Sequence, residues 1–256
     1  MVTFTGSTAV GRQVAARTGA AMKKGIFELG GSDAYVILAD ADLAHAADLC
    51  AESRLYNTGQ SCVAAKRFIV VEKIRERFER LFVERLQSRR LGDPRDPGTQ
   101  LGPLARADLR DKLHDQVRRS LRAGAKLLCG GQLPQSSEPG FFYPATALTN
   151  VRPGMPAFDE ELFGPVAAII SAKDERDAIR LANATPFGLG AAVFTRNRKR
   201  GEKIAREQLI AGSTFVNEFV RSHPTLPFGG VKLSGHGREL GPWGLREFTN
   251  IKTLSV

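Results

Sequence analysis

Short apolar runs alternate with amphipathic stretches along the whole chain of 256 residues. The apolar runs predict strands at residues 2–6, 25–30, 34–40, 67–72, 124–130, 166–172, 189–195, 213–217 and 251–256. The amphipathic stretches predict helices at Thr8–Ala20, Leu43–Tyr56, Ile74–Arg89, Ala105–Ala123, Glu175–Asn183 and Arg198–Gln208. Because strands that alternate with helices are typical of a mostly parallel sheet flanked by helices, the pattern predicts an α/β fold.

The composition is that of a globular protein, because 42% hydrophobic residues in a chain of this length can build a full core. The sequence has no run of about 18 apolar residues, and its beginning lacks the charged and apolar regions of a signal peptide. Cys50, Cys62 and Cys129 are odd in number and far apart, which argues against a disulfide framework and a zinc site. We therefore expect a cytoplasmic protein with reduced thiols, no membrane association and no metal.

The net charge of +10 raises the question of a nucleic-acid partner. The basic residues do not form one stripe. In residues 71–90, which read VEKIRERFERLFVERLQSRR, glutamates are interspersed with arginines and lysines at spacings that give solvated ion pairs. We therefore predict a solvated charged surface and no nucleic-acid binding, although the positive field would also favour an anionic small molecule.

The stretch FTGSTAVGR, residues 4–12, is a candidate phosphate-binding turn. A strand leads into Gly6, Ser7 can cap the following helix, and Gly11 permits close approach, so that backbone N–H groups can converge on an anion. Arg12 and Gln13 stand where a nucleotide-triphosphatase loop has Lys and Ser or Thr, so NTPase activity is not expected. The alternative is a helix start that is capped and has no ligand.

Two stretches carry candidate catalytic residues. In FELGG, residues 27–31, Glu28 ends a strand pattern, and a carboxylate that is desolvated at this place can serve as a general base. The alternative is that Glu28 is a solvated side chain or caps a helix. In NTGQSC, residues 57–62, Cys62 follows polar turn residues whose N–H groups can face an oxyanion. A lone cysteine is more often a core filler, which is how we read Cys50 and Cys129.

Two further stretches can shape a ligand site. In FDEELFGP, residues 158–165, Glu161 can accept both hydroxyls of a ribose and Phe163 can pack against a flat ring, or the stretch is only an acidic turn. In LPFGGVKLSGHGRELGPWG, residues 226–244, Phe228 and Trp243 lie among many Gly and Pro residues. This segment can form an apolar slot or a structural linker.

Taken together and in this order, FTGSTAVGR, FELGG, NTGQSC, EELFGP, PFGG and SGHGRELG make the sequence similar to the NAD(P)-dependent aldehyde dehydrogenase superfamily. The resemblance covers essentially the whole chain, and details such as CVAAKRFIV look most like the succinate-semialdehyde dehydrogenase branch. It implies that Cys62 attacks an aldehyde and that Glu28 activates the thiol or the hydrolytic water. It also implies NAD or NADP as cofactor, held by Gly6, Ser7, Gly11, Leu29, Glu161 and Phe163.

The resemblance further implies a domain organisation. Residues 1–30 would end the NAD(P)-binding domain, residues 31–232 would form the catalytic domain, and residues 233–256 would carry an oligomerisation strand. The strand pattern at 251–256 would leave an exposed edge in a monomer, so we expect a homo-oligomer, a dimer or a tetramer.

The sequence also departs from the family. Family members are much longer, and the front of the cofactor domain is absent here, together with the asparagine that completes the oxyanion hole. We therefore expect the catalytic half with a remnant of the cofactor domain. The alternative is an incompetent fragment that acts by association or keeps only cofactor-independent ester hydrolysis. Tyr56 stands where some semialdehyde dehydrogenases have a substrate-binding arginine, so we assign substrate contacts to Arg221, Ser222 and Phe228.

Overall fold

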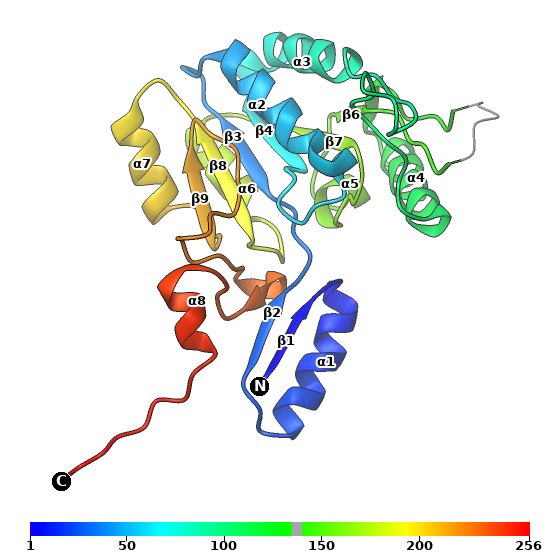
Figure 1. Ribbon diagram of the computed structural model, residues 1–256. Coiled ribbons are helices and arrows are strands. Elements are labelled where there is room, and N and C mark those ends of the chain that lie inside the picture. Colours follow the sequence, from blue (N-terminus) through cyan, green and yellow to red (C-terminus); the bar gives the residue numbers. More distant parts are fainter. Residues whose placement is uncertain (135–139) are drawn as a thin grey trace.

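The computed structural model describes residues 1–134 and 140–256, and in that part of the chain the strands form two sheets (Figure 1). The strands of the larger sheet are β3 (Ala34–Ile37), β4 (Arg67–Val71), β5 (Lys126–Cys129), β6 (Thr146–Thr149), β7 (Val166–Ala172), β8 (Gly190–Phe194) and β9 (Ser213–Val216). Their order is β5-β6-β7-β4-β3-β8-β9, and all neighbours are parallel except β5 and β6. The predicted α/β fold with a mostly parallel sheet is therefore confirmed.

Among the described residues, six helices flank this sheet: α2 (Leu43–Leu55), α3 (Glu72–Gln87), α4 (Ala107–Arg122), α5 (Pro156–Asp159), α6 (Glu175–Asn183) and α7 (Arg198–Glu207). The other two described helices, α1 (Thr8–Ala20) and α8 (Gly241–Glu247), lie beside the smaller sheet (Figure 1). The chain also forms short 3-10 turns at η1 (Tyr56–Gly59) and η2 (Lys232–Ser234). The sequence pattern did not predict α5, α8, β6 or the two-residue strand β10 (Gly235–His236). These elements are too short to show a hydrophobic period.

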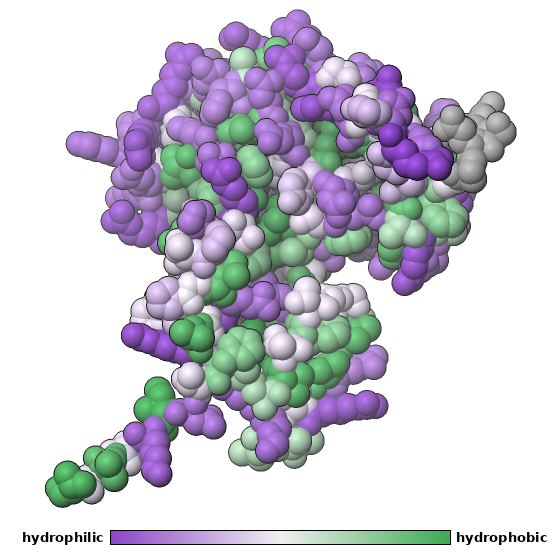
Figure 2. Space-filling model, in the orientation of Figure 1, coloured by the Kyte–Doolittle hydropathy of each residue, from purple (hydrophilic) through white to green (hydrophobic). Residues whose placement is uncertain are grey.

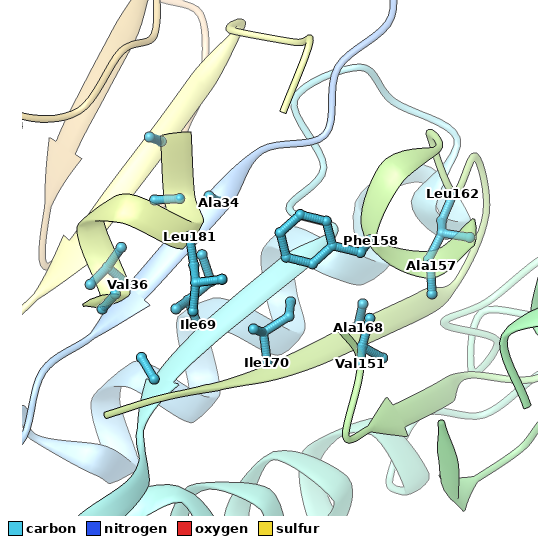
Figure 3. Packing of buried hydrophobic residues seen from close by; sticks show 14 of the residues in the cluster. Ala34, Val36, Ile69, Val151, Ala157, Phe158, Leu162, Ala168, Ile170 and Leu181 are labelled. Atoms are coloured by element: carbon cyan, nitrogen blue, oxygen red, sulfur yellow. The ribbon is translucent and has the colours of Figure 1, made fainter. Parts of the chain in front are cut away.

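The core lies on both faces of the large sheet, because helices cover both sides of its central strands (Figure 1). Successive residues of one strand enter different hydrophobic clusters: Val36 and Ile69 belong to one, and Tyr35 and Phe68 belong to the other. Figure 3 shows part of the first cluster, where Phe158 of α5 lies over the sheet among side chains from β3, β4 and β7. This core fixes the strand ends from which the site is built.

The small sheet has the order β1-β2-β10, with β1 (Val2–Thr5) parallel to β2 (Gly25–Glu28) and β10 antiparallel to β2. It combines the predicted first segment, residues 1–30, with residues of the predicted last segment, 233–256. A Cβ at Gly235 would lie 1.9 Å from the Phe27 carbonyl oxygen, and its φ of +117° favours glycine. This close approach lets β10 pair beside Glu28, the last residue of β2.

The C-terminal segment Ile251–Val256, predicted as a strand, pairs with no strand among the described residues and extends away from the body of the molecule (Figure 1). The reason is physical: among the described residues no strand edge gives this segment backbone hydrogen bonds. Figure 2 shows hydrophobic residues along this segment and over the small sheet and α1, whereas most of the same face of the large unit is hydrophilic. Exposed apolar side chains in residues 241–256, which comprise α8 and the C-terminal segment, include Trp243, Leu245, Phe248, Ile251 and Leu254. The role of this segment in an oligomer stays a prediction.

Within residues 1–134 and 140–256, none of the helices combines the length and the apolar character that crossing a bilayer requires. In the same residues, no group of three or more His, Cys, Asp or Glu side chains is arranged to hold a metal ion.

Candidate active site

One pocket of about 750 Å³ lies where the small sheet and α1 meet the large sheet. Its walls come from the turn between β1 and α1, the end of β2, the turn after η1, α4 and the segment after α5. Both candidate catalytic residues line this one cavity, although Glu28 ends a strand of the small sheet and Cys62 lies in the turn that leads to β4 of the large sheet. The predicted site residues that line it are Gly6, Ser7, Glu28, Leu29, Cys62, Glu161 and Phe163.

Cys62 is half-buried in the turn that follows α2 and η1. The chain takes the left-handed conformation at Asn57 (φ 50°), Thr58 (φ 55°) and Gly59 (φ 73°). Glycine is needed at the third position, because a Cβ there would lie 2.3 Å from a carbonyl oxygen of the neighbouring loop. The fully buried Arg54 donates from Nη2 to the Gly59 carbonyl oxygen at 2.8 Å. The turn that presents the thiol is thus held by packing and by a charged hydrogen bond.

The surroundings of Cys62 favour the protonated form of its thiol. Burial raises the pKa of the Cys62 thiol, and Lys66 is the cation that opposes this effect. The carboxylates of Asp33, Glu161 and Glu28 raise the pKa further. A base in the same pocket is therefore needed to make the thiolate.

Glu28 has the properties of such a base. Its residue is 4% exposed, and among the described residues neither carboxylate oxygen has a hydrogen-bond partner. Desolvation raises the pKa of the Glu28 carboxyl to about 7; nearby Glu239 adds to the rise, whereas Arg238 and the nearby backbone N–H of Gly230 oppose it. A Cβ at Gly229 would lie 2.8 Å from Oε1, so a glycine permits the backbone to pass close to the carboxyl. A carboxyl that titrates near neutral pH can both accept and return a proton.

Glu161 and the N-terminus of α1 line the same pocket. Glu161 Oε1 accepts the N–H of Gly31 at 3.0 Å, and a Cβ at Gly30 would lie 2.4 Å from Oε2, so the two glycines allow the chain after β2 to approach this carboxylate. Ser7 caps α1, whose N-terminal N–H groups favour an anion. The pocket therefore presents a helix terminus suited to a phosphate and a carboxylate suited to sugar hydroxyls.

Four predicted residues lie outside the lining of this pocket. Gly11 packs against the side chain of Leu29, because a Cβ at Gly11 would lie 2.3 Å from Cδ2. Arg221 lies over the ring of Phe219 at 5.5 Å, and Ser222 is exposed. Phe228 exchanges two backbone hydrogen bonds of 2.7 Å with the residue Glu239. The ligand contacts assigned to these four residues stay predictions.

The structure also brings in residues that sequence reasoning missed. Leu109, Lys112, Leu113 and Gln116 of α4 line the pocket, and Gln116 donates from Nε2 to the carbonyl oxygen of Glu161 at 3.2 Å. Their spacing is that of one helix face, so the amphipathic pattern of α4 contained the signal. Nothing in the pattern showed which ligand pocket that face would enter.

The class of protein is defined by comparison with known families. The model of the aldehyde dehydrogenase family matches residues 1–254. The chain belongs to this family, and the prediction made from its motifs is confirmed.

Two curated relatives are similar to this chain over nearly its whole length. The chain is 49% identical to succinate semialdehyde dehydrogenase [NAD(P)+] Sad of Escherichia coli (strain K12), over 99% of this chain and 54% of that protein. It is 44% identical to succinate-semialdehyde dehydrogenase [NADP(+)] of Mycobacterium leprae, over 99% of this chain and 55% of that protein. The chain thus spans about half the length of the curated relatives it matches.

Solved structures agree with the fold. The succinic semialdehyde dehydrogenase from Streptococcus pyogenes in complex with NADP+ has a TM-score of 0.95 and 38% identity, with 99% of this chain and 55% of that chain covered. A Mycobacterium tuberculosis aldehyde dehydrogenase complexed with NAD+ has a TM-score of 0.93 and 38% identity, with 97% and 51% covered.

Proposed function

We propose that this chain forms the catalytic portion of an NAD(P)-dependent aldehyde dehydrogenase that oxidises an aldehyde to the carboxylic acid. One observation carries the proposal: Cys62, in the turn after η1, and Glu28, at the end of β2 in the small sheet, line one pocket together with Glu161 and the N-terminus of α1. A thiol with a raised pKa that shares a pocket with a carboxyl whose pKa is about 7 is an arrangement of nucleophile and base.

In the proposed reaction, Glu28 takes the proton of the Cys62 thiol and the sulfur bonds to the aldehyde carbon. The carbonyl electron pair moves to oxygen, and the backbone N–H of Cys62 donates to that oxyanion. After the substrate carbon is oxidised, the acyl group is a thioester on Cys62. Glu28 releases the thiol proton to solvent and then takes a proton from water, and the water oxygen bonds to the acyl carbon. The C–S bond breaks to release the acid, and the proton on Glu28 returns to the Cys62 thiolate.

The residues of the pocket fit a nicotinamide dinucleotide. Ser7 and Gly6, at the start of α1, would lie along the phosphates, Glu161 would hold a ribose, and Leu29 and Phe163 would contact the nicotinamide side. When bound, NAD or NADP supplies the acceptor for the hydride that leaves the substrate carbon. Both forms occur in the names of the relatives, so we propose NAD(P) without a preference.

Succinate semialdehyde is the proposed aldehyde, because two relatives are named for it. Its free carboxylate needs a cationic or hydrogen-bonding partner. Arg221 and Ser222 are exposed and Phe228 is half-buried in the loop before and within PFGG, and we propose that they face the substrate. Homo-oligomerisation through residues 251–256 and a cytoplasmic location remain parts of the same proposal.

The competing proposal is a fragment that only associates with partners, which the half-length match to relatives keeps open. Alkylation by iodoacetamide and hydrolysis of p-nitrophenyl acetate separate the two, because acyl transfer requires the thiol but no hydride acceptor. We expect Cys62 to be labelled faster than the buried Cys50 and Cys129, with a rate that rises with pH. Cys62→Ser should abolish ester hydrolysis, whereas the matched control Cys129→Ser should retain it. Equal slow labelling of all three thiols, or full hydrolysis by Cys62→Ser, would favour the associating fragment.

A further inference from the structure

A buried lysine lies directly behind the proposed nucleophile. The side chain of Lys66, just before β4, has no exposed area. Its Nζ donates to the Cys62 carbonyl oxygen at 2.7 Å and to the Ser61 carbonyl oxygen at 3.0 Å. It also lies 3.8 Å from Glu161 Oε1. Neither the reaction nor the cofactor contacts proposed above use this ammonium group.

The contact with Ser61 bears on the proposed oxyanion donor. The carbonyl of Ser61 and the N–H of Cys62 belong to one peptide group, and in a trans peptide these two bonds point in opposite directions. An ammonium that holds the oxygen therefore turns the N–H away from itself and fixes its direction. Because the ammonium is a cation, it also draws electron density from the peptide and strengthens the N–H as a donor.

The contact with Cys62 places a positive charge close to the thiol. Four groups face the Lys66 ammonium: the carboxylates of Glu161 and Asp33, the guanidinium of Arg54 and the Cys62 thiol itself. Two cations and two carboxylates thus share this interior. On balance the pKa of Lys66 is lowered: burial is the largest cause and Arg54 adds to it, whereas Glu161, Asp33 and Cys62 oppose the decrease. The two carboxylates thus favour the charged form of the ammonium.

The same ammonium joins the two proposed catalytic segments. Glu161 Oε1, which lies beside Lys66, accepts the N–H of Gly31 in the turn that leaves the Glu28 strand. A continuous path of polar contacts therefore runs from the turn that holds Cys62, through Lys66 and Glu161, to the turn that follows β2.

We propose that Lys66 is a positioning residue that aims the Cys62 N–H at the oxyanion, supports the thiolate by its charge, and holds the nucleophile turn in register with Glu161. The inference rests on the proposed role of Cys62. It predicts that removing the charge and removing the hydrogen bonds have separable effects.

Two variants separate these effects. Lys66→Met keeps much of the side-chain volume and removes both the charge and the donors, whereas Lys66→Gln keeps an N–H donor without the charge. In both, the pH at which Cys62 alkylation reaches half its maximal rate should rise by about one unit, which makes labelling about tenfold slower at lower pH. The kcat of p-nitrophenyl acetate hydrolysis should fall at least about tenfold in Lys66→Met, and less in Lys66→Gln. Lys199→Met, on the exposed face of α7, controls for the loss of one positive charge and should behave like the wild type.

The outcomes are distinct. If wild-type Cys62 is not labelled faster than Cys50 and Cys129, the proposed function fails. If it is, and the Lys66 variants keep the wild-type pH profile and kcat, the positioning role is overturned, because a structural role alone would not move the profile. Rapid labelling of Cys50 and Cys129 would report an unfolded Lys66→Met, and the two measurements on Lys66→Gln then decide.

Discussion

Replacing Glu28 by glutamine should stabilise the protein while removing its proposed base. The Glu28 carboxyl is buried at the end of β2, and among the described residues neither of its oxygens has a hydrogen-bond partner. Above a pH of about 7 the folded chain therefore holds a desolvated carboxylate, whereas in the unfolded chain water solvates the same group. Glu28→Gln keeps the shape and removes the charge, so it isolates this cost.

The size and sign of the effect follow from the pKa. The folded state raises the pKa of Glu28 from 4.5 to about 7, so between these pH values the folded chain binds more protons than the unfolded chain. Wild-type stability therefore decreases as pH rises through this window, and the full loss, about 3 kcal/mol, is reached above it. Below pH 4.5 both states are protonated at this position and the loss vanishes.

Urea unfolding at intervals from pH 4 to pH 9 measures the effect. The free energy of unfolding of Glu28→Gln minus that of the wild type should be constant below pH 4.5, rise by about 3 kcal/mol, and become constant again above pH 7 to 8. Glu76→Gln, on the exposed face of α3, controls for the loss of one surface carboxylate. A difference for Glu28→Gln that does not change with pH would refute the reasoning, since it would mean that the carboxyl is not desolvated by folding.

Two further substitutions, each with a matched control, test the contacts that hold the helices and strands around the site. Arg67 is buried and donates to the last carbonyls of α6, so Arg67→Met should lower the free energy of unfolding by about 2–4 kcal/mol, whereas the exposed Arg80→Met should change it by less than about 0.5 kcal/mol. In Gly235→Ala the new Cβ would meet the Phe27 carbonyl oxygen at 1.9 Å and separate β10 from β2, so we expect a loss of about 2 kcal/mol or more and slower ester hydrolysis. Gly19→Ala, where a Cβ meets no atom within 4 Å, should be neutral or stabilising in the same urea titration.

Local signals explain which parts of the fold were predictable. The ends of α1 and α6 agree with the predicted ones, because Ser7 and Asp174 are capping residues whose side chains accept N–H groups of the first helical turn. The strands of the large sheet showed as apolar runs because both faces are buried. By contrast, β10 is set by one close approach at Gly235, and the strand pattern at 251–256 pairs with no strand in the part of the chain that the structure describes. Pairing depends on a neighbour, which a local pattern does not contain.

Site residues that belong to sequence motifs were predictable, whereas residues that matter because the fold buries them were not. Motif order placed Cys62, Glu28 and Glu161 in one site, and the structure brings all three to one pocket. Lys66 and Arg54 gave no such signal, because lysine and arginine are usually exposed and only the tertiary fold buries them. Their importance lies in what they contact, and those contacts depend on the fold as a whole.

The buried polar atoms without partners point to the same region independently of any motif. Among the described residues, the buried side-chain atoms that lack a hydrogen-bond partner are mostly those of Glu28, Asp33 and Arg54. Glu28 lines the pocket, while the charges of Asp33 and Arg54 act on Lys66 behind the Cys62 turn. Each such group costs folding free energy, and a fold under selection for stability alone would pair or remove it. These unpartnered charged groups gather around the Cys62 thiol, as is expected of a site that holds charges in place before a reaction. Groups that already had hydrogen-bond partners in the protein would have to break those bonds before they could act on a ligand.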